Sequence, residues 1–222
     1  DGLMEDITAD SLRHAPNFQG SANGCVFRNS YFEDNNGEWH GGYTAENLME
    51  NITINNVDGL RGVNALISNK LDDDISGHDP HLHGQVVYNC DLQIHKNNCQ
   101  AILLGGLMKN WVFAYNRILN NNQQPTLLFG DYADSLFFIG NNIGMMNYSS
   151  HEREYAVKFQ EHGWDTVNLA YTTASNHIDP HFTSVIFRDN VFHGYPDNKI
   201  WDNDPGSALI KENNTIINSY SE

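Results

Sequence analysis

One short phrase recurs along the chain: an apolar run, a central Asn or Asp, then β-branched or aromatic residues. It reads Asn-Leu-Met-Glu-Asn-Ile-Thr-Ile at residues 47–54 and Leu-Met-Glu-Asp-Ile-Thr at residues 3–8. The central polar residues of the series are Asp6, Asn29, Asn51, Asn89, Asn116, Asn142, Asn190 and Asn214. Gaps of 22 to 27 residues separate most of them, and longer gaps of 38 (51 to 89) and 48 (142 to 190) separate two pairs. A repeat of this length favours a β-solenoid.

The recurring asparagines indicate a stacked column at one bend of such a solenoid. Parallel strands lie about 4.8 Å apart, so equivalent side chains of successive turns of the chain come within hydrogen-bonding reach. An Asn amide both donates and accepts, and Asn tolerates the left-handed backbone conformation of a tight bend. We therefore predict that Asn29, Asn51, Asn89, Asn116, Asn142, Asn190 and Asn214 form a single column.

The rest of the sequence fits one all-β domain over residues 1–222, which we interpret as part of a longer chain. Aromatic and β-branched residues are frequent, and no long amphipathic helical run is present. Second strands are expected at 101–104 and 126–129, each of which runs into Gly. The two long gaps predict loop insertions at 65–84 and 146–183, projecting from one side of the solenoid. The alternative for the gap of 48 residues is two coils with a degenerate mark near Asn168.

The strongly negative charge of the chain excludes several classes of binding partner. The formal net charge is −16 with only 12 Lys plus Arg and no basic cluster, which argues against binding to nucleic acid or to an anionic membrane surface. No apolar run reaches the roughly 18 residues of a transmembrane helix, so membrane insertion is not expected. The cysteines Cys25, Cys90 and Cys99 form no even framework, and the first two are interpreted as buried core residues.

The Asn-marked repeats resemble those of the right-handed parallel β-helix superfamily, the pectin-lyase-like fold. A narrower resemblance, to a group of bacterial β-helix proteins, lies in the Trp-His-Gly-Gly turn at 39–42 and the Glu-Asn-Leu-x-Glu-Asn run at 46–51. The resemblance implies a right-handed parallel β-helix of roughly eight or nine coils. The superfamily contains polysaccharide lyases, glycoside hydrolases, epimerases and phage tailspikes, and fold alone does not choose among them. No catalytic signature of these families can be placed on this sequence.

The first candidate site is the turn that contains Glu38, Trp39 and His40, with Tyr43 close behind. Apolar sugar faces pack on Trp rings, while His and Glu can bind hydroxyls or move protons. We therefore assign Glu38 and His40 as candidate catalytic residues and Trp39 and Tyr43 as candidate substrate-binding residues. The alternative is a structural corner in which Trp39 caps the core.

The second candidate is the loop that contains Asp79 and His81. Its residues are assigned as candidate catalytic groups lining a glycan groove next to the Trp39 turn. Imidazole and carboxylate are also metal ligands, but the spacing matches no established motif, so we predict no metal site. No cofactor is required by the sequence, and the carboxylates leave calcium as the open option.

Further candidates are scattered along the chain. Asp131 follows a predicted strand and is the second carboxyl that a glycosidase would need. A lyase would instead need a base close to a cation, and Arg61, Lys109 and Arg117 are the plausible cations for that role, the first two being assigned as candidate substrate-binding residues. Trp164, in the second insertion, completes the candidate substrate-binding set.

These observations favour an extracellular polysaccharide-active β-helix protein, a lyase or glycoside hydrolase working in a groove along the solenoid. The alternative is a non-catalytic rod, a glycan-binding phage tailspike or surface adhesin segment. In either case we expect a location outside the cell or on a cell or virion surface, a glycan partner, and a monomer or homotrimer.

Overall fold

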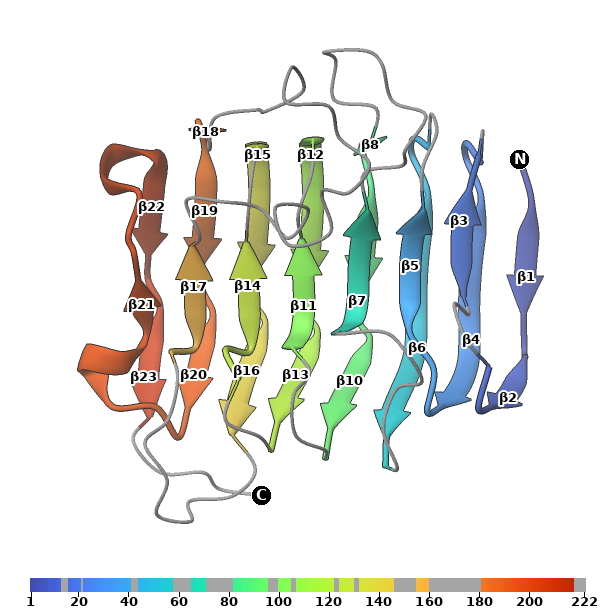
Figure 1. Cartoon of the computed structure of the whole chain (residues 1–222), viewed down its shortest axis with the longest axis horizontal. Coiled ribbons are helices and arrows are strands. Elements are labelled where there is room, and N and C mark those ends of the chain that lie inside the picture. The colour runs from blue at the N-terminus through green and yellow to red at the C-terminus, as the bar shows by residue number, and fades with distance from the viewer. Residues whose placement is uncertain are drawn as a thin grey trace, which may run out of the picture.

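The computed structural model describes residues 1–12, 16–20, 22–40, 44–57, 65–70, 82–95, 100–104, 107–121, 124–129, 132–145, 155–159 and 181–217. Within these residues the protein is almost entirely β-structure, arranged in two sheets of parallel strands (Figure 1). Two short 3-10 turns, η2 (Asp197–Lys199) and η3 (Gly206–Ala208), lie near the C-terminal end. No helix in the described part of the chain is long and apolar enough to cross a membrane.

Sheet A has 16 strands and sheet B has 7. Sheet A contains β1 (Leu3–Glu5), β2 (Thr8–Asp10), β4 (Val26–Glu33), β6 (Leu48–Asn56), β8 (Leu82–His83), β9 (Val86–Tyr88), β10 (Asp91–Ile94), β12 (Leu107–Ala114), β13 (Arg117–Asn120), β15 (Tyr132–Ile139), β16 (Asn142–Met145), β18 (His181–Phe182), β19 (Val185–Arg188), β20 (Val191–His193), β22 (Leu209–Glu212) and β23 (Thr215–Ile217). Sheet B contains β3 (Asn17–Gln19), β5 (Gly37–His40), β7 (Ala65–Lys70), β11 (Gln100–Leu104), β14 (Leu127–Phe129), β17 (Val157–Phe159) and β21 (Trp201–Asp202).

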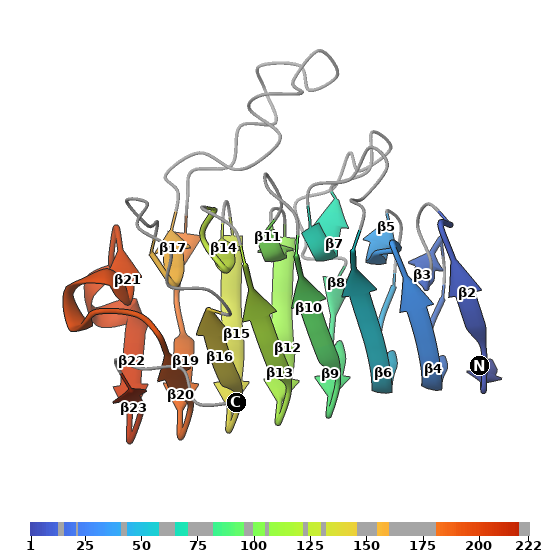
Figure 2. The same ribbon diagram turned by 90° about the horizontal axis from the view of Figure 1, so that it is seen from below.

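The register of the pairs equals one sequence repeat. Leu3 lies beside Val26, Val26 beside Leu48, and Leu48 beside Val86. We call one passage of the chain through sheet A and then sheet B a circuit; Figures 1 and 2 show both sheets running along the same long axis, with the first circuit at one end and the last at the other. The described residues contain eight strands in succession after the main bend of sheet A: β2, β4, β6, β10, β13, β16, β20 and β23.

Sheet B confirms the predicted second strands, since β11 and β14 cover 101–104 and most of 126–129. The predicted insertions were placed too broadly. Residues 65–70 form β7 and residues 157–159 form β17, and both strands pair within sheet B. Each long gap is therefore a single circuit with its own sheet B strand. The side on which the remaining insertion residues project lies outside the described residues.

The main bend of sheet A has two adjacent positions, an outer one and an inner one. The outer residue has a left-handed backbone in every circuit, with φ between +50° and +63°: Asp6, Asn29, Asn51, Asn89, Tyr115, Gly140, Asp189 and Asn213. Asn and Gly adopt this conformation most readily. In the first half of the molecule the outer asparagines are exposed, and Asn51 donates to Asn29 at 3.2 Å while Asn89 donates to Asn51 at 2.6 Å.

The inner position carries a second column, formed by Asn116, Asn141, Asn190 and Asn214, of which the first three are buried and Asn214 is half-buried. Each follows the outer residue by one place, and the Nδ2 of each of the first three donates to the Oδ1 of the next member at 3.0 Å. Each Nδ2 also donates to a main-chain carbonyl of the preceding circuit, as Asn190 does to Phe138 at 2.9 Å. One buried Asn therefore links three circuits.

The prediction of a single column was therefore wrong in detail. The asparagines share one bend but occupy two columns that are offset by one residue, and the change occurs between Asn89 and Asn116. Asn142 belongs to neither column, because it starts β16 beside Arg117 and Val191. Asn141 takes the ladder position instead.

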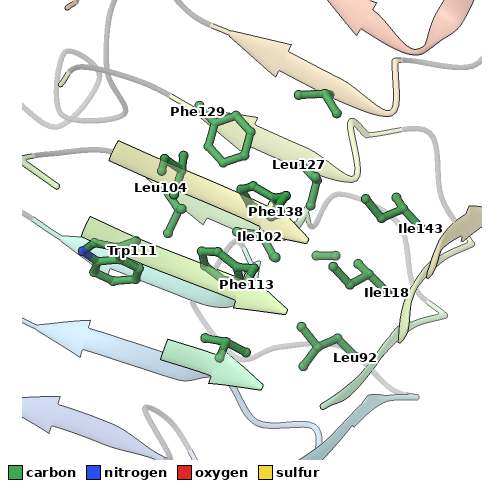
Figure 3. Packing of buried hydrophobic residues seen from close by; sticks show 14 of the residues in the cluster. Leu92, Ile102, Leu104, Trp111, Phe113, Ile118, Leu127, Phe129, Phe138 and Ile143 are labelled. Carbon is green, nitrogen blue, oxygen red and sulfur yellow. The ribbon is translucent and has the colours of Figure 1, made fainter. Parts of the chain in front are cut away.

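Between the two sheets lies one continuous apolar core (Figure 3). Phe113, Phe138 and Phe187 stack face to face, with centroids 4.7 Å apart in both pairs. This spacing equals the distance between parallel strands, so the rings follow the backbone register. Phe129 of sheet B meets the edge of this stack at Phe138, with centroids 5.4 Å apart.

The inner column should matter more for stability than the outer one. We expect Asn190→Ala to lower the free energy of unfolding by about 3 kcal/mol, since several buried partners lose hydrogen bonds worth about 1–3 kcal/mol each. Asn51→Gly, which keeps the left-handed bend in the exposed column, should lower it by less than about 1 kcal/mol. Chemical denaturation of both variants measures the difference. Equal losses would show that burial of the inner column is not the source of its stabilising effect.

Candidate functional site

Trp39 lies in the core and not on the surface. Its side chain is 0% exposed, stacks on Phe18 with centroids 5.3 Å apart, and meets the edge of Trp111 at 5.0 Å. The indole Nε1 donates to Oε1 of Gln85 at 2.8 Å. The prediction of Trp39 as a sugar-stacking residue was therefore wrong. In a strand, alternate residues face opposite sides, and the phase of β5 turns Trp39 inward.

Glu38 is equally inaccessible, with 0% exposed. A carboxyl with no exposed surface does not reach a polymer on the outside of the protein, so the assignment of Glu38 to catalysis on a surface-bound glycan was wrong too. The alternative, a structural corner, is not what the structure shows either, because Gly37–His40 form strand β5 of sheet B and Trp39 lies within the core. Of His40, only the backbone, which ends β5, belongs to the described residues.

Of the remaining candidate residues, only Lys109 belongs to the described part of the chain. Tyr43, Arg61, Asp79, His81, Asp131 and Trp164 all lie outside the described residues. Their assignments stay predictions, as does the groove they were expected to line. Lys109 is described, and it stands on the outer face of β12.

Lys109 belongs to a small polar cluster on that outer face. Its Nζ lies 3.8 Å from Asp134 Oδ2, and β12 and β15 place the two residues side by side. Asp134 Oδ1 accepts hydrogen bonds from Thr183 Oγ1 at 2.7 Å and from Ser135 Oγ at 3.1 Å. The hydroxyl of Thr183 is the main reason that the pKa of Asp134 is lowered, with Ser135 and Lys109 acting in the same direction against partial burial. Asp134 is thus held ionised, which does not suit a proton donor.

A second polar cluster lies beyond the main bend; it contains Arg117, one of the plausible cations, together with two residues that the sequence did not single out. On the outer face of β10 and β13, Arg117 Nη1 donates to both carboxylate oxygens of Asp91, at 3.0 and 2.9 Å. Gln93 Nε2 donates to Asp91 Oδ2 at 2.7 Å. The guanidinium, carboxylate and amide are all planar groups, and the guanidinium and carboxylate are partly exposed. We call Asp91, Gln93 and Arg117 the polar grip.

Next to the polar grip stands an exposed aromatic ring. Tyr115 precedes Arg117 by two residues at the outer position of the bend, and it is 59% exposed. Its ring is held from two sides: Tyr88 meets it edge-on with centroids 5.9 Å apart, and it lies so close to Gly140 that a Cβ there would come within 2.7 Å of Tyr115 Cε1. Gly140 is therefore required for this approach, while its φ of +63° is the left-handed conformation that Asp, Asn and Tyr also adopt at this position in other circuits.

The sequence did contain a signal for Tyr115. Asn29, Asn51 and Asn89 occupy the outer position of three successive circuits, and Tyr115 is the next residue in that series. A bulky residue with positive φ is uncommon, and strain of this kind concentrates at functional sites. In an alignment of the repeats on their outer positions, Tyr115 stands where the three preceding circuits have Asn.

The described residues offer no other reactive centre of the usual kinds. Among them no three His, Cys, Asp or Glu side chains come together in a way that could hold a metal ion. Burial raises the pKa of the Cys90 thiol to about 12, so that thiol stays protonated and unreactive. Cys90 is buried as expected, whereas Cys25 is only half-buried.

The position of Trp39 predicts the effect of removing it. We expect Trp39→Ala to lower the free energy of unfolding by about 3–5 kcal/mol, the usual loss for a large aromatic side chain in a core. Thermal and denaturant unfolding measure this. A variant with unchanged stability would contradict the buried position of the indole.

The contact between Thr183 and Asp134 predicts a pH effect. Thr183→Val should raise the pKa of Asp134 towards its ordinary value, because it removes the hydrogen bond that lowers it most. A folded-state pKa below the unfolded one stabilises the protein above the unfolded value, and this stabilisation is lost as pH falls through the folded value. The variant should therefore be less stable than the parent at neutral pH, and the difference should disappear in acid.

Carboxyl NMR titration of Asp134 and melting temperatures measured from acid to neutral pH test this. Ser11→Ala serves as a control, since it removes a hydroxyl that donates to Asp10, a carboxyl far from Asp134 in the first circuit. A Thr183→Val variant in which Asp134 titrates as in the parent would contradict the prediction.

Comparisons with known proteins identify no relative of this chain. No protein-family model, no curated protein and no solved structure matches it. The resemblance to the pectin-lyase-like superfamily therefore rests on the sequence repeats alone. The function has to be argued from the geometry of the polar grip and its surroundings.

Proposed function

We propose that the protein is a right-handed parallel β-helix that binds an extended, uncharged polysaccharide outside the cell or on a cell or virion surface. Support for the fold comes from the parallel register, which advances by one circuit at each strand, and from the columns of asparagines at one bend. The right-handed sense follows from the general rule that about 98% of parallel crossover connections are right-handed.

The observation that carries the binding function is the exposed, fixed ring of Tyr115 beside the polar grip. An aromatic ring offers a flat apolar surface to the C–H face of a sugar. Asp91 accepts hydrogen bonds from sugar hydroxyls, and Arg117 and Gln93 donate them. The three grip residues already hold one another in place, so they lose little freedom when a ligand binds.

The surrounding face suits a long ligand rather than a single sugar. Outward side chains of successive circuits stand in line at about 4.8 Å intervals. The row that contains Asp91 and Arg117 continues to Tyr31 and Thr53 on one side and to Asn142 on the other. A polysaccharide lying along the axis would meet a polar side chain in every described circuit of this row except one, in which Val191 follows Asn142.

The charge of the protein decides which polysaccharide fits. The net charge of −16 repels anionic polymers. Within the grip the one cation, Arg117, is already neutralised by Asp91, and Glu33 adds a further carboxylate on the same face. An uncharged glycan therefore fits better than a uronic acid polymer.

Cleavage is our second and separate proposal, as a glycoside hydrolase of the neutral glycan or as a lyase, whose chemistry would require a uronate polymer as its substrate. It is supported by the cluster of Lys109 and Asp134, a cation beside an ionised carboxylate on the outer surface. A lyase uses such a cation to neutralise the substrate and a nearby base to remove a proton. Incubation with a panel of glycans, followed by assays for reducing ends and for unsaturated products, tests cleavage. Lys109→Gln should abolish any activity that depends on this cluster.

Binding is best tested with substitutions that keep the fold. Tyr115→Asn restores the residue found at the equivalent position of earlier circuits, so it removes the ring while keeping the left-handed bend. Arg117→Gln removes the cation of the grip. We expect each to weaken binding at least about tenfold, which corresponds to about 1.4 kcal/mol. Affinity electrophoresis against neutral glucans, mannans and galactans, with a polyuronate for comparison, measures this.

Lys158→Gln is the matched control, because Lys158 is also a partly exposed cation paired with a carboxylate, Asp202, but on sheet B. It should bind like the parent. Absence of binding to every neutral glycan would overturn the proposal. So would preferential binding of the polyuronate, or equal weakening by Lys158→Gln.

A further inference from the structure

An unbroken apolar row runs along the outer face of sheet A just before the main bend. Strand register places one member in each circuit, and none of the eight is polar: Leu3, Val26, Leu48, Val86, Val112, Phe137, Ile186 and Ile210. Their strand neighbours on the other side are core residues such as Met49, Val87 and Phe113, so the row faces outward. All eight are partly or fully exposed. Single exposed apolar residues are ordinary, but a continuous stripe marks an interaction surface.

A second outward row lies two residues further along each strand and is charged only towards its ends. In order of circuits it reads Glu5, Arg28, Glu50, Tyr88, Ala114, Ile139, Arg188 and Glu212. Arg28 is paired with Glu5 at 2.7 Å, and Arg188 is paired with Glu212. We call this the charged row. Together the two rows form a strip whose middle is apolar and whose ends carry charges of both signs.

The charges disfavour parallel assemblies of this face. When copies associate with their axes parallel, circuits of equal number lie at the same level. In a face-to-face parallel pair strand direction is reversed across the contact, so the apolar row of one copy meets the charged row of the other. Arg28 and Glu50 would then lie against apolar side chains and gain no opposite charge from the partner. Burying a charge without such a partner destabilises an interface, so parallel association, a homotrimer included, is disfavoured on this face.

An antiparallel pair behaves differently. A two-fold axis along the strand direction sets apolar row on apolar row and charged row on charged row. When the axis passes through the fifth circuit, at Val112 and Ala114, circuit two faces circuit eight and circuit three faces circuit seven. Arg28 then faces the partner's Glu212, and Glu50 faces the partner's Arg188. Each contact occurs twice by symmetry.

Neighbouring registers lack this match. Moving the axis half a circuit, between Val86 and Val112, sets Arg28 against the partner's Arg188 and Glu5 against the partner's Glu212. Moving it by a full circuit sets Arg28 against the partner's Ile139. Only the register centred on Val112 leaves opposite charges at both ends and apolar residues throughout the middle.

We propose that this strip is the interface of an antiparallel two-fold dimer centred on Val112. Seven circuits, two to eight, overlap in this dimer and extend over about 29 Å at about 4.8 Å per strand. A strip two rows wide and of that length is a small interface, below the roughly 800 Å² per partner of the standard size, so the charge pairs decide the register. A second copy fits better than a membrane, because the strip carries acidic residues at both ends and the whole chain is anionic.

The position of the axis gives a sharp test. In the dimer the two copies of Val112 face each other across sheets that pack about 10 Å apart, too far for a disulfide, so Val112→Cys should be cross-linked into a dimer by a bismaleimide with a spacer of about 10 Å. Val26→Cys is the matched control, because its counterpart lies six circuits away in the partner, about 29 Å, beyond the reach of that reagent. The parent protein, run alongside, gives the background from its native cysteines. Linkage through Val26→Cys, or none through Val112→Cys, would overturn the proposal.

The oligomeric state and the charge pairs give an independent test. Sedimentation of the parent should show a dimer, and Val112→Arg should halve the molar mass while Thr215→Arg, on the other outer face, should not. Glu50→Arg and Arg188→Glu should each weaken the dimer, and the double variant should recover it. Circular dichroism confirms that each variant is folded. A monomeric or trimeric parent, a dimer indifferent to Val112→Arg, or adsorption of the monomer to phosphatidylcholine vesicles would each overturn the proposal.

Discussion

Parallel pairing at one fixed spacing governs the whole molecule. Because each strand lies beside its equivalent one repeat later, every side chain meets the same position of the next circuit at about 4.8 Å. Phe113 and Phe138 stack at 4.7 Å for this reason, and the amides of Asn141 and Asn190 hydrogen-bond at 3.0 Å for the same reason. A side chain therefore stabilises the fold mainly by contacting a side chain of the same type in the next circuit. A substitution in such a column affects the contacts with the circuit before it and with the circuit after it.

Much of the architecture could be predicted from the repeats, because a residue type that recurs at a fixed period imposes a fixed register. The predictions that were wrong were wrong by a single position in the sequence. Asn142 was chosen over Asn141, since the sequence shows two adjacent asparagines and only the register shows which faces inward. Trp39 failed in the same way: a strand turns alternate residues to opposite sides, and nothing in the letters of a short strand tells which side is the core. The period of the sequence thus predicts well where each circuit lies, but it predicts poorly whether a given side chain points into the core or outward.

The proposed binding surface was harder to predict because it depends on neighbours far apart in the chain. Arg117 and Asp91 are 26 residues apart, and although Arg117 is one of few cations in the sequence, nothing there pairs it with Asp91. They meet only because one repeat of register brings them together. Tyr115 acquires its importance from what it replaces, a stacked Asn, and from Gly140, whose missing Cβ makes room for the ring. Candidate residues chosen for their reactivity, such as Glu38, were instead drawn into the interior.

The main bend also divides the outer surface into two chemically different faces. Val112 and Arg117 are only five residues apart, but the left-handed turn at Tyr115 and Asn116 points them to different sides of the molecule. The apolar strip and the polar grip can therefore serve two partners at once. An antiparallel dimer formed through the strip would leave both grips open and related by the two-fold axis. Two linked sites on one polymer bind more tightly than either alone, since the second event becomes intramolecular. Self-association would then raise the avidity for a long glycan without any new contact to it.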